Sequence, residues 1–292
     1  MTITVGGTNI TFSNSTNQAT AYIGEANYQV FSSSGTFTVP TGITQVKVYV
    51  FGGGSGGAGS DFGSIQGRTG INGSTGVAIV TGLTPGASIA VTVGAGGNGG
   101  NGGSNSVAAT NGAAGGTSSF GSYVSAAGGP ATAASNTYSA STIPAVTFTS
   151  CQKIYGYSGG PKNTQARQYS SSVPPAPYDL NTPYLGEVGG GNAGLSAYVG
   201  GCLSWAGGGG GGGMSGGGGG GSMSSVSPTA WGGAAWGPGS DGSNGTVSNT
   251  GSAKTGGNGG GSTGGTGGNN WSSAGWGGGG GGGGGGGVVV IW

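Results

Sequence analysis

The chain has 292 residues, of which 82 are glycine and 11 are charged (six Lys or Arg and five Asp or Glu), and it contains no histidine. An average soluble domain has about 7% glycine and about a quarter charged residues, so this composition lies far outside the ordinary globular range. The net charge of +1 offers no basic surface for nucleic acid, no apolar run approaches the roughly 20 residues that span a bilayer, and the first residues lack the basic and apolar regions of a secretory signal.

The first predicted element is a short hairpin. Ile3–Val5 and Asn9–Phe12 flank a Gly6-Gly7 pair, which is typical of a tight turn. We predict that residues 1–30 form a β segment for attachment or trimerisation. A glycine-rich domain is expected to follow at 31–292.

The next predicted elements are strands that open this domain. Gly35–Pro40 precedes a second strand at 46–51, whose residues alternate with the period of two that a half-buried strand requires. The alternation predicts that Val46, Val48 and Val50 face one side and Lys47, Tyr49 and Phe51 the other. Residues 77–80 and 89–93 are predicted to form a further strand pair, turned through Leu83–Gly86.

Glycine-rich stretches follow these strands closely, and longer ones come later in the chain. They include 52–59, 94–103, 207–213, 216–221 and 277–287. Flexible linkers are the simplest interpretation of Gly/Ser tracts, but 33% of the chain is hydrophobic, which opposes disorder. A helix is excluded because glycine costs about 1 kcal/mol per position there relative to alanine.

One packed arrangement does suit such tracts. A polyproline-II chain has three residues per turn, rises about 3.1 Å per residue and makes no internal hydrogen bonds. Chains of this kind packed side by side can pair their backbone groups laterally, provided that no Cβ keeps them apart. The predicted fold class is therefore mainly β and irregular: small antiparallel β elements plus a polyglycine-II helix bundle, with essentially no α-helix.

A Tyr/Pro-rich insertion is predicted at about 130–206. It holds seven of the 11 prolines, seven of the 11 tyrosines and both cysteines. Tyrosine-rich ordered loops on a rigid scaffold are typical of recognition surfaces. The residues predicted to bind a receptor are Tyr155, Tyr157, Lys162, Arg167, Tyr169, Tyr178, Asp179 and Tyr184.

Two further features leave alternatives open. Trp231 and Trp271 lie in Ser-, Pro- or Asn-bearing turns, where they either contact a receptor or cover the flanks of glycine rods. Cys151 and Cys202 either close a loop of about 50 residues as a disulfide, worth about 3–4 kcal/mol, or stay as thiols in a reducing cytoplasm.

Four pieces of the chain, in order, resemble the glycine-rich domains of phage tail fibres. They are Gly35–Val48, Leu83–Gly97, Gly115–Gly121 and the polyglycine run that ends on Val288–Trp292. In composition the chain is also similar to the distal adhesins of T-even-like phages. That resemblance implies a polyglycine-II sandwich whose loops bind an outer-membrane protein or a surface glycan, a virion location that is extracellular after lysis, contact with other tail proteins through residues 1–30, and a possible homotrimer.

No enzymatic site is predicted. The carboxylates Asp179 and Glu187 are the best candidates for glycan hydrolysis, but acid–base chemistry without histidine has few donors. We expect no catalytic residue, metal or cofactor, no nucleic-acid partner and no membrane insertion. The alternatives to a receptor-binding adhesin are a purely structural fibre or capsid-decoration protein and an ice-binding protein.

Overall fold

The structure is a computed structural model that describes eleven stretches of the chain and the backbone of five short strands. The stretches are 27–61, 67–104, 107–134, 145–157, 209–218, 220–221, 232, 235, 238–246, 255–269 and 279–292, and the short strands are β1 (Ile3–Val5), β2 (Ile10–Phe12), β3 (Asn17–Gln18), β13 (Arg167–Gln168) and β14 (Ala197–Tyr198). No helix occurs in these residues. This part of the chain is mainly β and irregular, as predicted.

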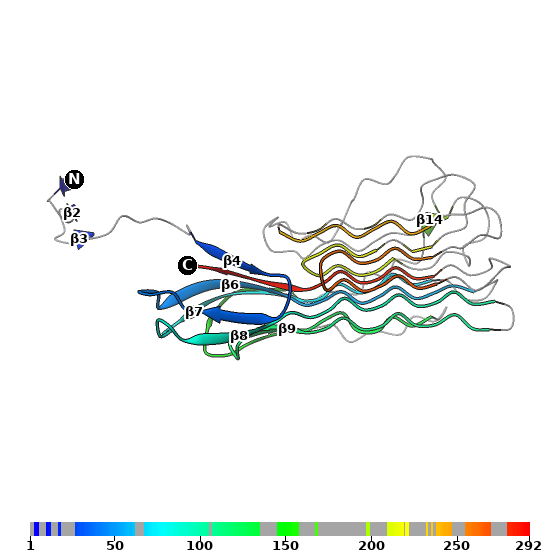
Figure 1. Ribbon diagram of the computed structural model, residues 1–292, viewed down its shortest axis with the longest axis horizontal. Coiled ribbons are helices and arrows are strands. Elements are labelled where there is room, and N and C mark those ends of the chain that lie inside the picture. The colour runs from blue at the N-terminus through cyan, green and yellow to red at the C-terminus, as the bar shows by residue number, and fades with distance from the viewer. Residues whose placement is uncertain are drawn as a thin grey trace.

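Two five-stranded sheets form a sandwich at one end of the described domain (Figure 1). One sheet has the order β12-β7-β6-β15-β4 and the other β11-β10-β9-β8-β5, and all of their pairings are antiparallel. The strands are β4 (Tyr28–Phe31), β5 (Gly35–Thr38), β6 (Gln45–Phe51), β7 (Thr75–Thr81), β8 (Ser88–Thr92), β9 (Ser118–Phe120), β10 (Val124–Ala126), β11 (Val146–Phe148), β12 (Gln152–Tyr157) and β15 (Gly287–Ile291).

The hydrophobic core lies between the two sheets. Val46, Val48 and Val50 of β6 are fully buried there together with Phe37 and Phe120. The opposite side of β6 carries Lys47, Tyr49 and Phe51, and Phe51 packs in a second, smaller cluster with Met214 and Val289. The alternation predicted for this strand is therefore confirmed on both faces.

The predicted pairing of 77–80 with 89–93 is wrong. Both segments are strands, but β7 pairs with β6 and β12, whereas β8 pairs with β5 and β9 in the other sheet. Gly82 and Gly86, at φ of 72° and 83°, turn the chain from one sheet to the other. This connection contacts the one between β5 and β6, which also passes from one sheet to the other. The contact is a hydrogen bond in which Gly86 N–H donates to the carbonyl of Val39 at 2.8 Å.

The predicted N-terminal hairpin is confirmed in its pairing. β1 pairs antiparallel with β2, with Ile3 opposite Phe12 and Val5 opposite Ile10, and β3 adds a third strand. The two-residue strands β13 and β14 form a separate parallel pair.

Extended rods continue the sandwich strands away from the core. In Figure 1 the strands run on as undulating, near-parallel segments that fill the other half of the domain. The rods are 52–61, 67–74, 93–104, 108–117, 127–134, 209–213, 216–221 (without 219, which lies outside the described residues), 239–246, 255–260, 263–269 and 279–286. Strands and rods thus form one continuous body, because β6, β8 and β10 lead into rods and β7, β9 and β15 follow from them.

Candidate recognition surface

Rod 52–61 is hydrogen-bonded to six other rods. Successive N–H groups along it donate to three different neighbouring rods in turn. Residues 52, 55 and 58 donate to rod 67–74, residues 53, 56 and 59 to rod 108–117, and residues 54 and 57 to rod 279–286, at 2.8–3.1 Å. Its carbonyls accept from three further rods, 93–104, 127–134 and 209–213. Because every third residue donates to the same neighbour, the rod has three residues per turn, as in polyglycine II.

Rod 279–286 is a second centre of the same kind. It donates to rods 93–104, 209–213 and 255–260 and accepts from 52–61, 216–221 and 263–269. Six bonded neighbours around each of two adjacent rods define a hexagonal lattice. The predicted lateral pairing of glycine-rich segments is therefore present in the structure.

Close approach between rods explains the glycine content. A Cβ added at Gly56 would overlap the carbonyl group of Asn98, and one added at Gly283 would overlap that of Gly54. The obstacle is backbone in both cases and cannot move aside by a rotamer change. Residues with side chains occur where a rod faces solvent or a roomier gap, as at Ala95 and Ser55.

The register of the lattice brings many rod ends to one level, at the end of the bundle away from the sandwich. We call this the distal end. Gly103 N–H donates to Ser60 O, Gly102 N–H to Asn269 O, and Gly221 N–H to Gly279 O, all at 2.8 Å. The described residues on both sides of 62–66, 105–106 and 270–278, which themselves lie outside the described residues, are therefore at the distal end.

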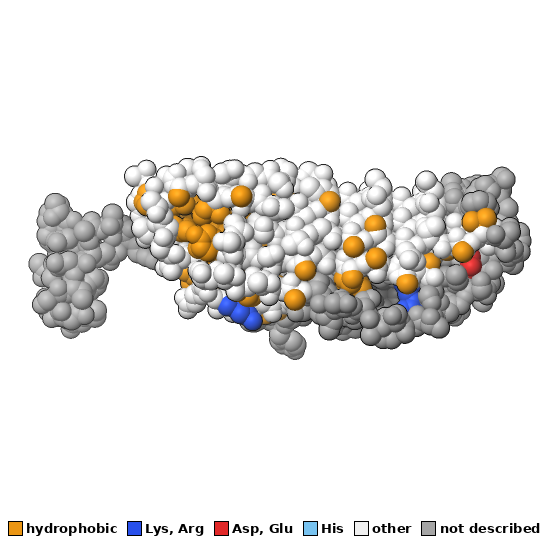
Figure 2. All heavy atoms as spheres, turned by 90° about the horizontal axis from the view of Figure 1, so that it is seen from below, with side chains coloured by type: hydrophobic (Ala, Val, Ile, Leu, Met, Phe, Trp, Pro, Cys, Tyr) orange, Lys and Arg blue, Asp and Glu red, His pale blue; other side chains and the backbone are white. Residues whose placement is uncertain are grey.

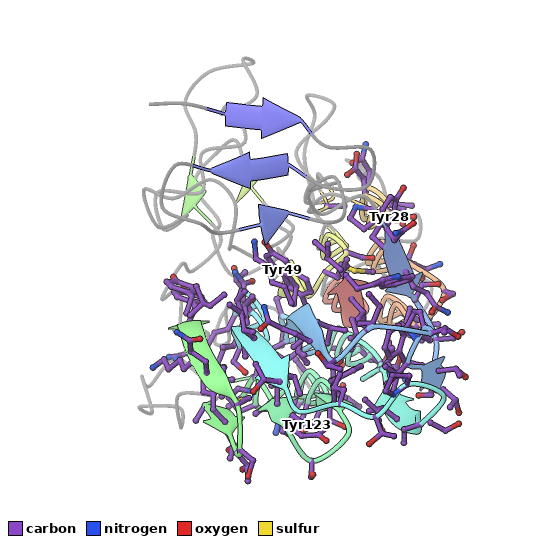
Figure 3. All side chains as sticks on the ribbon, turned by 90° about the vertical axis from the view of Figure 1, so that its left-hand side faces the viewer. Tyr28, Tyr49 and Tyr123 are labelled. Atoms are coloured by element: carbon purple, nitrogen blue, oxygen red, sulfur yellow. The ribbon has the colours of Figure 1, made fainter. Side chains whose placement is uncertain are left out.

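The end of the β-sandwich that faces away from the rods forms the opposite end of the domain. Tyr28 begins β4 and pairs with Ile291, so it lies at the end of the sheet farthest from the rods, and its side chain is 69% exposed. Figure 3 views the molecule from this end, with Tyr28 and Tyr49 on the side of one sheet and Tyr123 on the other side of the sandwich. Residue 27 and Trp292 meet here, because Trp292 N–H donates to Asn27 O at 3.0 Å.

Two of the predicted receptor-binding residues, Tyr155 and Tyr157, lie on β12 rather than in a loop. This strand is an edge of its sheet, with a register irregularity between Lys153 and Tyr155 that leaves Ile154 49% exposed. Both tyrosines are half-buried. Burial raises the pKa of Tyr155 above its ordinary value, and the neighbouring Tyr157 adds to the shift.

The other predicted site residues are not brought together by the described part of the structure. Arg167 lies in β13, where only the backbone is described. The remaining ones lie outside the described residues: Lys162, Tyr169, Tyr178, Asp179, Tyr184, Trp231 and Trp271. Cys151 is a free thiol whose Sγ donates to Tyr123 O at 3.3 Å, and its partner in the disulfide alternative, Cys202, also lies outside.

Sequence reasoning missed a row of polar side chains on the rods. Asn98 and Asn101 are exposed on rod 93–104, and Thr266 and Asn269 are exposed beside them on rod 263–269. Three residues of polyglycine II span about 9 Å, which sets the repeat along each rod. The signal in the sequence was Asn at a spacing of three within a glycine tract. Figure 2 shows one side of the bundle on which uncharged atoms predominate along the rods.

Within the described residues, no group of three or more Cys, Asp or Glu side chains is placed to hold a metal ion. In the same residues no helix has the length and apolarity needed to cross a membrane. No known protein-family model matches the chain, and no curated protein matches it.

Proposed function

We propose that this protein is a receptor-binding module of a phage tail fibre or tail tip, in which a polyglycine-II bundle displays binding segments at its distal end. The observation that carries the proposal is the common level at which rods 52–61, 93–104, 263–269 and 279–286 end. A chain segment whose two flanking residues are fixed on a rigid lattice loses less conformational entropy on binding than a segment without such anchors. The likeness of the sequence to phage tail fibre domains supplies the biological setting.

The arrangement of the two ends supports a division of labour. Asn27, the first residue of the described domain, lies at the end of the sandwich opposite the rod tips, on the side away from the proposed binding surface. A fibre attached through that side would present the distal end to a host cell. The proposed partner is a host surface protein or glycan, and the proposed role is binding without catalysis.

Trp271 is the predicted contact residue that we would test first. It lies in the segment 270–278, which joins two rods whose described ends, Asn269 and Gly279, are both at the distal end. Aromatic side chains in such positions dominate binding energy in many interfaces. The tyrosines of the insertion, Tyr178 among them, form a second group that the same experiment can separate from Trp271.

The test is binding of the purified, labelled protein to whole host cells. We expect saturable binding by the parent protein, and a loss of about tenfold or more in affinity for Trp271→Ala or Tyr178→Ala, since an aromatic hot spot contributes about 2 kcal/mol or more. Tyr28→Ala is the matched control, because it removes an exposed aromatic ring at the opposite end. Absence of cell binding by the folded parent protein would leave only a structural role in the fibre, and equal loss with the control would disprove a distal site.

Catalysis is tested in the same preparation. Incubation with host polysaccharide is expected to release no new reducing ends. Their appearance would reassign the protein to the glycan-cleaving class.

A further inference from the structure

All six Asn-Gly dipeptides of the chain lie within rods. In every one of them the Asn side-chain oxygen accepts a hydrogen bond from a backbone N–H of a neighbouring segment, which is a rod in every case except that of Gly232. The pairs are Asn72 with Gly212 (2.7 Å), Asn98 with Thr266 (3.0 Å), Asn101 with Asn269 (2.9 Å), Asn111 with Ala134 (2.8 Å), Asn244 with Gly232 (2.9 Å) and Asn258 with Gly267 (3.0 Å). The one Asp-Gly dipeptide does the same, with Ala235 N–H donating to Asp241 Oδ1 at 2.7 Å.

The glycine of the dipeptide completes a two-point contact. Between the parallel rods 93–104 and 263–269, Thr266 N–H donates to Asn98 Oδ1 and Gly99 N–H donates to Thr266 O at 2.8 Å. Both backbone groups of Thr266 are thus held by one Asn-Gly step. Asn101-Gly102 holds Asn269 in the same way, three residues further along.

Antiparallel rods show a shifted version of this contact. Asn258 Oδ1 accepts from Gly267 N–H, while Gly259 N–H donates to Gly265 O, two residues away. Asn111-Gly112 repeats the shift with Ala134 and Thr132. The dipeptide therefore binds both parallel and antiparallel neighbouring rods. Its two hydrogen bonds go to one residue of a parallel rod and to two residues, two positions apart, of an antiparallel rod.

The surface rods of a glycine lattice need side-chain acceptors for backbone N–H groups that have no neighbouring rod to bond. A rod at the surface has no neighbour on its outer side, and an N–H left there is a template for pairing, as at an open sheet edge. Thr266 and Asn269 are exposed, and the acceptor for each of their N–H groups is a side chain of the adjacent rod.

We propose that these Asx-Gly dipeptides are clamps that select the neighbours of the rods that carry them, and that the exposed clamps at Asn98 and Asn101 close the lattice edge against a second copy of this chain. The partner that an unclamped edge would accept is a glycine-rich rod of another molecule, added through backbone hydrogen bonds. At Asn98 and Asn101 the clamp uses the side-chain oxygen as the acceptor for the edge N–H.

The test compares Asn98→Gly/Asn101→Gly with Ala95→Gly, which adds a glycine to the same exposed row without removing a clamp. Sedimentation velocity across a range of concentrations reports association, and hydrogen exchange reports the amides of Thr266 and Asn269. We expect the double variant to associate beyond the parent state and its two amides to exchange about tenfold faster, the effect of losing one hydrogen bond. The control is expected to match the parent in both measurements.

Asn98→Asp/Asn101→Asp supplies an acceptor again and is expected to restore slow exchange at both amides. Unchanged amide exchange in the Gly double variant would disprove the clamp. Faster exchange with unchanged association would disprove its role at the lattice edge. If the double variant does not fold, Asn101→Gly alone is measured at the Asn269 amide, with the same two outcomes.

Discussion

The rings of Phe37 and Trp292 lie with their centroids 5.4 Å apart, at an interplanar angle of 59°. Phe37 is fully buried on β5, and Trp292 follows β15 in the other sheet. This contact therefore joins the two sheets at the end of the sandwich away from the rods. Phe120 also packs against Phe37, with a centroid distance of 5.8 Å.

Truncation of this aromatic contact is expected to destabilise the sandwich. Phe37→Ala should lower the free energy of unfolding by about 3–5 kcal/mol, because it leaves a cavity in the core. A double-mutant cycle with Trp292→Ala should give a coupling energy of about 0.5–1.5 kcal/mol, the value for an aromatic pair. Denaturant unfolding checks both numbers, and additive effects would show that the two rings do not interact.

A single methyl group inside the lattice is expected to be more damaging than one in a strand. Gly283→Ala places its Cβ against the carbonyl of Gly54, and we expect a loss of about 3 kcal/mol or more in the free energy of unfolding. Gly35→Ala is the control, because its Cβ would meet only the Phe31 ring, at an ordinary contact distance of 3.6 Å. Equal unfolding midpoints for the two variants would contradict the backbone-to-backbone packing.

Asn-Gly steps are prone to deamidation, in which the glycine nitrogen attacks the Asn side-chain carbonyl and ammonia is released. In the folded protein Gly99 N–H is bonded to Thr266 O and the Asn98 side chain is held by Thr266 N–H, so the attack geometry is blocked. We expect Asn98 and Asn101 to keep their amides far longer in buffer than in denaturant. Peptide mass spectrometry after timed incubation measures this, and equal rates in both conditions would show that the rods open freely.

Alkaline pH is expected to weaken the β12 edge through Tyr155. Its folded-state pKa is raised by burial, so the neutral phenol is favoured in the folded protein. The sign follows from linkage: stability is intact below the unfolded pKa of about 10 and falls as the pH rises above it. Urea midpoints at about pH 9 and about pH 11 should therefore differ less in Tyr155→Phe than in the parent.

The parts of the fold that depend on local pattern were predictable. The alternation in β6 gave its buried face, and glycine tracts too costly to order in a helix predicted laterally paired rods. The pairing of β7 and β8 was not predictable, because a crossover between sheets and a hairpin show the same alternation. What decides between them is the contact of Gly86 with Val39, which the sequence places far away.

The candidate surface was harder to predict for the same reason. Asn-Gly is the usual signal of a two-residue hairpin turn, whereas Asn98-Gly99 here lies inside a rod and contacts a residue 168 positions later. Tyr155 was expected in a loop and lies in an edge strand instead. Its pairing with Val77 joins two segments whose local sequence patterns are unrelated, so the sequence gives no sign of it.

The central place of rod 279–286 has a consequence for synthesis. All six of its bonded neighbours precede it in the chain, so a ribosome would release every other rod of that cluster before the one around which they gather. Until then the earlier rods would lack the partner they share, and contacts of such long range form slowly. A nascent chain interrupted before residue 279 should accordingly be captured by chaperones or degraded rather than accumulate as a shorter bundle.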